Sequence, residues 1–200
     1  MTFQPVRESR VGEITLSAML LVGGFSRRMG RDKATLVIEG LPLWEKQVST
    51  LRMLNPKAIY ISTRTAPAWC PPDAQPLLDT PPSCGPLSGL AAGLGAINTT
   101  HLVVLAVDMP HMTGQHLKKM ADLVKPGIGI VPSNGERFEP LAAIYPKPAL
   151  ASAKAALASA DFSMQSLVRQ LIQIGLMREH LLENSERALY RNLNSPDELP

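Results

Sequence analysis

The first apolar run of the chain leads into the sequence Leu20-Leu21-Val22-Gly23-Gly24-Phe25-Ser26-Arg27-Arg28-Met29-Gly30-Arg31-Asp32-Lys33. The apolar residues predict a buried strand that stops at the double glycine. Glycine permits positive φ angles and lets the backbone approach a ligand closely, because it has no Cβ. Loop N–H groups followed by a hydroxyl and several cations are typical of an anion site. We therefore expect this loop to bind a polyphosphate.

Two well-known phosphate loops do not fit this spacing. A Walker A loop has the pattern G-x-x-x-x-G-K-[ST], whereas here five residues separate Gly24 from Gly30 and Lys33 is followed by Ala34. The dinucleotide pattern G-x-G-x-x-G is broken at Gly23-Gly24-Phe25. The remaining alternative is a simple glycine turn with a solvated basic face.

The charge of the chain is unevenly distributed. Residues 1–64 contain ten Lys and Arg against five Asp and Glu, and residues 65–200 contain ten against twelve. The positive field therefore surrounds the glycine loop, which suits a small anionic ligand. An aromatic content of 4% provides few surfaces for stacking bases, so we do not expect a nucleic acid partner.

Composition and length indicate one cytoplasmic domain. The 200 residues, 45% of them hydrophobic, suffice for a single core over residues 14–200, preceded by a polar lead-in at 1–13. This lead-in does not resemble a signal peptide, and the apolar runs are too short to cross a membrane. Cys70 and Cys84 form no metal or CxxC pattern, so we expect reduced thiols.

Strand and helix patterns alternate along the chain. Apolar runs predict strands at about 15–22, 58–61, 76–79, 101–107, 128–131 and 141–145. Helical patterns cover about 43–54, 86–97, 113–124 with Thr113 as cap, 149–159, and a last helix capped by Asp161 or Ser163. This alternation predicts an α/β fold with a single doubly wound, mostly parallel, Rossmann-like sheet.

The ends of these strands carry the candidate chemistry. Ligands of open α/β sheets bind beyond the carboxyl ends of the strands, where the glycine loop, Ser62 and Asp108 are expected. Asp108 follows an apolar strand, and one carboxylate suffices for Mg²⁺ when phosphate oxygens complete its coordination. Asp108 could instead cap the turn into Pro110. Asp79 could contact a base or ribose, or begin the turn at 80–82.

The glycine loop resembles the signature L-x-G-G-x-S-x-R-M-G-x-D-K of the GT-A-type nucleotidyltransferases. It is most similar to that of the molybdenum cofactor guanylyltransferases, which make molybdopterin-guanine dinucleotide. Four later segments also resemble this family: 85–89 its G-P-L-x-G motif, 107–110 its metal-binding D-x-P motif, 139–141 its E-P-L motif and 192–196 its N-x-N-[ST]-P motif. The resemblance implies the nucleotide-diphospho-sugar transferase type of fold.

The resemblance also implies roles for individual residues. The implied catalytic residues are Arg28, Lys33 and Asp108, with Asp108 as the ligand of Mg²⁺. The implied nucleotide-binding residues are Leu21, Val22, Gly23, Gly24, Ser26, Gly30, Lys33, Ser62, Asp79, Gly85 and Asp108. The implied acceptor-binding residues are Arg137, Glu139 and Asn194. The family usually has asparagine after its second strand, where this chain has Ser62, with Thr63 as the alternative alignment.

The activity that the resemblance implies is transfer of GMP from GTP to the phosphate of molybdopterin, with release of pyrophosphate. A phosphate monoester has a second pKa of about 6, so this acceptor needs no general base. The expected partners are GTP and a molybdopterin-type cofactor, and then molybdenum-insertion and molybdoenzyme maturation proteins. Two alternatives stay open: a nucleotidyltransferase of the same fold that uses CTP, a sugar phosphate or another cofactor, and a non-catalytic nucleotide-binding regulator.

Overall fold

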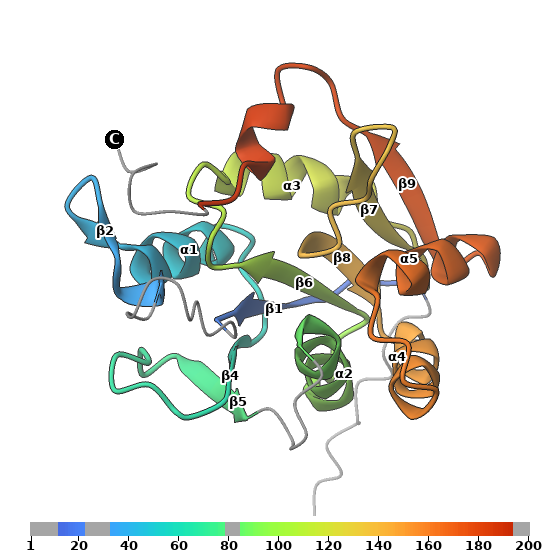
Figure 1. Cartoon of the computed structure of the whole chain (residues 1–200), viewed down its shortest axis with the longest axis horizontal. Coiled ribbons are helices and arrows are strands. Elements are labelled where there is room, and N and C mark those ends of the chain that lie inside the picture. The colour runs from blue at the N-terminus through green and yellow to red at the C-terminus, as the bar shows by residue number, and fades with distance from the viewer. Residues whose placement is uncertain (1–11, 23–32, 79–84, 194–200) are drawn as a thin grey trace, which may run out of the picture.

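The computed structural model describes residues 12–22, 33–78 and 85–193. Seven strands form one sheet in the order β5-β4-β1-β6-β8-β7-β9 (Figure 1). They are β1 (Leu16–Leu21), β4 (Ile59–Thr63), β5 (Ala74–Leu78), β6 (His101–Ala106), β7 (Gly129–Ser133), β8 (Ala142–Pro146) and β9 (Met177–Leu181). A separate hairpin pairs β2 (Val37–Ile38) with β3 (Leu41–Pro42). The helices are α1 (Leu43–Arg52), α2 (Pro86–Ala96), α3 (Gly114–Asp122), α4 (Ala149–Ala158) and α5 (Met164–Gln173), with 3-10 turns η1 (Lys33–Thr35) and η2 (Arg187–Tyr190).

The sheet is mostly parallel, as the sequence predicts. β8 runs antiparallel to both β6 and β7, and the other neighbouring pairs are parallel. β7 and β9 therefore point the same way as β1, β4, β5 and β6. As a result, the loops that follow these six strands lie at one edge of the sheet, together with the loop that leads into β8. All candidate site residues that the structure describes belong to this edge.

Helices cover both faces of the sheet, which confirms the doubly wound architecture. α1 and α3 pack on one face, and α2, α4 and α5 pack on the other (Figure 1). Successive residues of a strand point to opposite faces, so in β1 Ala18 and Leu20 join the first core and Met19 and Leu21 join the second. Among the described residues, no helix combines the length and apolar character needed to cross a membrane.

α2 lies unusually close to the sheet because two glycines face it. A Cβ added at Gly93 would lie 2.6 Å from the sulfur of Met19 and 2.8 Å from a methyl carbon of Leu102. A Cβ added at Gly89 would meet Ser62 Oγ and would lie 2.8 Å from a methyl carbon of Leu21. All four of these distances are below 3.0 Å, which is too short for a contact with a Cβ atom. The absence of a Cβ at Gly89 and Gly93 therefore allows α2 to pack closely on the sheet.

The predicted helices and strands are confirmed with small shifts at their ends, and both cap predictions are resolved. Thr113 Oγ1 accepts a hydrogen bond from the N–H of His116, and Ser163 Oγ accepts one from the N–H of Ser166. Ser163, and not Asp161, is therefore the cap of α5. The sequence patterns did not predict β9, the β2–β3 hairpin or the 3-10 turns η1 and η2. β9 is an edge strand whose central residues are partly or fully exposed, so it has no apolar run.

Candidate active site

Three neighbouring strands bring their ends together at the centre of this edge. The N–H of Val22 donates to the carbonyl oxygen of Ser62 at 3.0 Å, and the N–H of Val107 donates to that of Leu21 at 3.0 Å. The end of β1 is thus held between the residues that follow β4 and β6. Asp108 comes directly after Val107, so this backbone pairing places it beside the end of β1.

Lys33 and Asp108 form an ion pair in this region. Lys33 Nζ lies 3.6 Å from Asp108 Oδ2, and 18% of the lysine side chain and 27% of the aspartate side chain are exposed. Lys33 Nζ also donates to the carbonyl oxygen of Leu193 at 2.8 Å, and the N–H of Leu193 donates to the carbonyl oxygen of Asp108 at 2.8 Å. An ammonium has three donors, so Lys33 retains capacity to bind a ligand beside Asp108.

A buried glutamine supports the turn that carries Asp108. Gln47 of α1 is fully buried, and its Nε2 donates to the carbonyl oxygen of Met109 at 2.5 Å. Gln47 was not among the predicted site residues, although its place in the helical pattern marks it as unusual. Gln47 occupies the position of the buried α1 stripe between Leu43 and Leu51, where an apolar residue is expected. A polar residue at such a position needs a specific hydrogen-bond partner.

Ser62 and Thr63, the two candidate base-contacting residues at the end of β4, differ in their surroundings. Adjacent strand residues point to opposite faces, and Ser62 packs on the α2 side, where Gly89 leaves room for its hydroxyl. Thr63 Oγ1 instead donates to the carbonyl oxygen of Thr65 at 2.9 Å. Ser62 is buried and pairs in register with Leu21. Of the two, Ser62 is therefore the residue beside the end of β1.

The first residue before α2 has a backbone that favours glycine. Gly85 has a φ of 72° at the N-terminal cap of α2, in the left-handed region that side chains disfavour. The other predicted site residues of the loops lie outside the described residues, and nothing in the structure bears on them. They are Gly23, Gly24, Ser26, Arg28, Gly30, Asp79 and Asn194.

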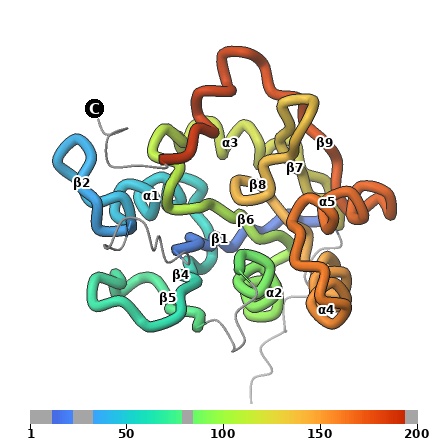
Figure 2. Tube along the Cα trace, in the orientation of Figure 1, coloured from blue at the N-terminus to red at the C-terminus, as the bar shows by residue number. Residues whose placement is uncertain are grey.

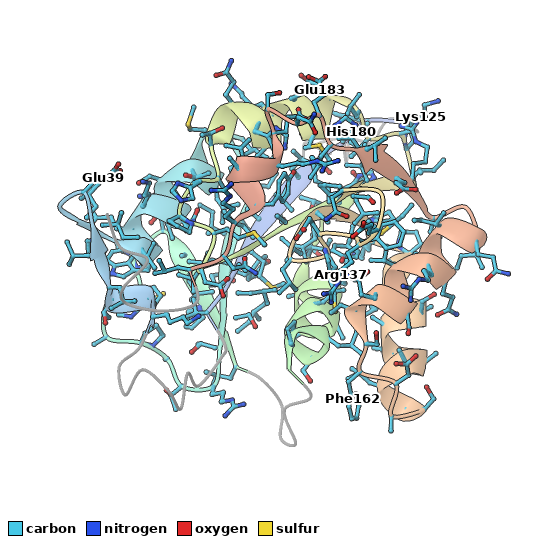
Figure 3. The ribbon with its side chains drawn as sticks, turned by 45° about the horizontal axis from the view of Figure 1, so that its top comes forward. Glu39, Lys125, Arg137, Phe162, His180 and Glu183 are labelled. Atoms are coloured by element: carbon cyan, nitrogen blue, oxygen red, sulfur yellow. The ribbon has the colours of Figure 1, made fainter. Side chains whose placement is uncertain are left out.

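Two of the three predicted acceptor residues, Arg137 and Glu139, lie in the loop that connects β7 and β8. Asn134 Oδ1 accepts hydrogen bonds from the N–H groups of Glu136 and Arg137, at 3.0 and 2.8 Å. Arg137 is exposed and is labelled in Figure 3, whereas Glu139 is half-buried. Burial raises the pKa of the Glu139 carboxyl, and the nearby Arg137 guanidinium partly opposes that rise. This loop lies at the same edge of the sheet as Asp108 and leads into β8, where the carbonyl oxygen of Leu141 accepts a hydrogen bond from the N–H of Ala106 at 2.8 Å.

The donor set suits a cation that is completed by its substrate. Among residues 12–22, 33–78 and 85–193, no group of three or more His, Cys, Asp or Glu side chains could hold a metal ion. Mg²⁺ commonly binds one or two carboxylates and takes its other ligands from substrate phosphates and water. The partly exposed carboxylate of Asp108 fits that arrangement as a single protein ligand, and the Lys33 ammonium lies 3.6 Å from it.

Comparison with known proteins defines first the class and then the family. A structure described as a nucleotidyl transferase from Methanothermobacter thermautotroptrophicus superposes with a TM-score of 0.73, at 17% identity over 92% of this chain and 94% of that one. The fold is thus one that nucleotidyltransferases use. The model of the MobA-like NTP transferase domain matches residues 18–174. The chain belongs to this family.

Individual relatives are similar in sequence to this chain along most of their length. One from Opitutus terrae, named "Probable molybdenum cofactor guanylyltransferase", is 36% identical over 186 residues, which span 92% of each chain. One from Pseudomonas fluorescens, named molybdenum cofactor guanylyltransferase, is 32% identical over 80% of this chain and 82% of its own. The similarity therefore includes the candidate site and both layers of helices.

Proposed function

We propose that this protein is a molybdenum cofactor guanylyltransferase, which transfers GMP from GTP to the phosphate of molybdopterin and releases pyrophosphate. The observation that carries the proposal is the ion pair between Lys33 of η1 and Asp108, which follows β6, with 3.6 Å between Nζ and Oδ2. The names of the full-length relatives support the same activity. They also supply the identity of the base and the acceptor.

In this proposal the protein aligns two phosphates and balances their charge. The acceptor phosphate is largely ionised at neutral pH, so it can attack the α-phosphorus of GTP without a base from the protein. Lys33 would meet the phosphates of GTP with the donors that Leu193 leaves free, and Arg28 would add a second cation. Asp108 would hold Mg²⁺, which when bound neutralises charge on the phosphate oxygens.

The other contacts divide between the two substrates. Leu21, Val22, Gly23 and Ser62 would contact the base and ribose at the ends of β1 and β4, together with Asp79 and Gly85. Gly24 and Gly30 of the glycine loop would let its backbone approach the phosphates. Ser26 would donate to the phosphates. Arg137, Glu139 and Asn194 would bind the molybdopterin side. Support for this division is that Arg137 and Glu139 belong to the β7–β8 loop, whereas Lys33 belongs to η1 and Asp108 follows β6.

Pyrophosphate release decides between this proposal and its alternatives. The protein is incubated with Mg²⁺ and molybdopterin, and with GTP, CTP, ATP or UTP in separate reactions. The proposal predicts release that requires both GTP and molybdopterin. Pyrophosphate release with CTP and with no other nucleotide would show that the protein is a cytidylyltransferase and not a guanylyltransferase. Nucleotide binding without any pyrophosphate release would indicate a non-catalytic regulator.

A further inference from the structure

The last described segment of the chain returns to the active site. After β9, the N–H of Leu182 donates to the carbonyl oxygen of Ser133 at 2.8 Å, and residues 183–193 then run beside α3 towards the end of β6 (Figure 2). The segment ends at Leu193, which bonds to Lys33 through its carbonyl oxygen and to Asp108 through its N–H. The position of these two residues therefore depends on what holds this segment.

A buried pair fixes the middle of the segment to α3. The hydroxyl of Tyr190 lies 2.6 Å from Nε2 of His116, and each residue is only 6% exposed. The tyrosine ring meets the imidazole edge-on, with ring centres 5.4 Å apart. Burial lowers the pKa of His116, so its imidazole is neutral at neutral pH. A neutral imidazole accepts a hydrogen bond at one nitrogen, so His116 Nε2 can accept a hydrogen bond from the Tyr190 hydroxyl.

A buried carboxylate fixes the start of the same segment. Glu186 Oε1 accepts a hydrogen bond from Lys119 Nζ of α3 at 2.7 Å, and Oε2 accepts one from the N–H of Glu183 at 3.0 Å. His116 Nδ1 lies 3.6 Å from Oε1 and His180 Nε2 lies 3.7 Å from Oε2. Figure 3 shows His180 and Glu183 together above α3. Both ends of η2 are thus tied to the helix beneath.

We propose that Tyr190 and His116 are positioning residues for the Lys33–Asp108 pair. Their hydrogen bond keeps η2 on α3, so that the backbone of Leu193 holds the Lys33 ammonium and the Asp108 backbone in place together. Neither residue touches the pair directly, and the effect passes through Leu193. The catalytic part of this inference rests on the proposed function, whereas the hold on Leu193 is independent of it.

The test is Tyr190→Phe, with Tyr60→Phe as its matched control. Tyr60 is also 6% exposed, but its hydroxyl donates to the carbonyl oxygen of Ala96 at 3.4 Å, at the end of α2. Both variants lose one buried hydroxyl and keep the ring. The full-length proteins are compared by hydrogen exchange of the peptide that contains Leu193, and by kcat and KM for GTP per folded enzyme. Glu186→Gln provides a second variant that weakens the same hold through Lys119.

We expect the Leu193 amide hydrogen to exchange faster with solvent in Tyr190→Phe than in the unmodified protein. We also expect kcat to fall about tenfold, because misplacing reacting groups slows the reaction steeply, while KM for GTP stays within about twofold. Glu186→Gln shifts both readouts in the same direction, and Tyr60→Phe shifts neither. Unchanged exchange at Leu193 in Tyr190→Phe overturns the inference, as does an equal loss of kcat in Tyr60→Phe. If the unmodified protein transfers no GMP, the proposed function fails. Hydrogen exchange at Leu193 still tests whether the Tyr190–His116 hydrogen bond fixes the position of Leu193.

Discussion

Leu193 donates its backbone N–H to the carbonyl oxygen of Asp108 at 2.8 Å, and this bond joins the last described residue to the end of the central strand. The same residue accepts a hydrogen bond from Lys33, which lies 160 residues earlier in the chain. The site is therefore assembled from the start, the middle and the end of the sequence. Its geometry includes backbone groups as well as charged side chains.

Gln47→Glu should destabilise the protein in a pH-dependent way. The buried side chain can donate to Met109 only when it is protonated, and ionising a buried carboxyl costs free energy. We expect a loss of about 3 kcal/mol at about pH 8 and a smaller loss at about pH 5, because burial raises the pKa of such a carboxyl. The measurement is urea unfolding at both pH values.

Gln47→Met provides the control for that experiment. It keeps the length of the side chain and removes the hydrogen bond, so we expect a loss of about 1 kcal/mol at either pH. A pH-independent loss in Gln47→Glu, equal to that of Gln47→Met, would contradict the role of the Gln47 amide at the Asp108 turn.

Gly89→Ala should weaken both folding and GTP binding. The new Cβ would meet Ser62 Oγ and a methyl of Leu21, so we expect a destabilisation of about 1–3 kcal/mol. GTP affinity should fall because these two residues lie at the proposed base-binding ends of β1 and β4. Gly95→Ala is the matched control on the same helix, where a Cβ meets nothing within 4 Å. That control should be neutral or slightly stabilising, by up to about 1 kcal/mol.

Thermal unfolding and calorimetric titration with GTP test both variants of α2. If Gly89→Ala were as stable as Gly95→Ala, the close packing of α2 on Ser62 would not matter for the fold. If it bound GTP normally despite its instability, Ser62 and Leu21 would not belong to the nucleotide site.

Arg137→Ala should separate the two substrates. Its side chain is exposed, and its backbone is held by Asn134 independently of the guanidinium, so the loop should keep its shape. We expect weaker binding of molybdopterin, because a cation for its phosphate is lost, and unchanged binding of GTP. Calorimetric titration with each ligand tests this. Equal losses for both ligands, or none, would remove Arg137 from the acceptor side.

Apolar patterning predicted most of the sheet and the helices because buried strands such as β6 need continuous apolar runs. It could not predict β9, since Arg178 and Glu179 at the sheet edge remain exposed. The strand pattern predicted that the glycine loop and Asp108 lie at one edge of the sheet, and the family resemblance implied that Lys33 and Asp108 serve one site. The role of Leu193 left no sequence signal, because its contacts use backbone groups that any residue carries. Gln47 did leave one, as a polar residue within an apolar helical stripe.

Glu139→Gln should stabilise the protein at neutral pH. Burial raises the pKa of Glu139 above its ordinary value, so ionisation of this carboxyl disfavours the folded state as pH rises. The penalty is absent below the unfolded pKa of about 4.3 and complete above the raised folded pKa. The glutamine variant removes that penalty, so its Tm should exceed that of the unmodified protein at about pH 7, and the difference should disappear at about pH 4.

Thermal unfolding across this pH range provides the measurement. A difference in Tm that is constant with pH would show that the carboxyl does not titrate differently in the folded state. A lower Tm for the variant at neutral pH would reveal a favourable partner for the ionised Glu139.

Transfer of label from GTP labelled with ³²P at the α-phosphorus tests the central claim most directly. The labelled nucleotide is incubated with Mg²⁺, molybdopterin and either the unmodified protein or Asp108→Asn, whose side chain has nearly the same shape but binds Mg²⁺ poorly. The account predicts that the unmodified protein moves the label into a molybdopterin-guanine dinucleotide, and that Asp108→Asn loses this transfer at least about a hundredfold while its Tm stays close to that of the unmodified protein. Transfer by Asp108→Asn within a few-fold of the unmodified rate, or no label in the molybdopterin product of the unmodified protein, would contradict it.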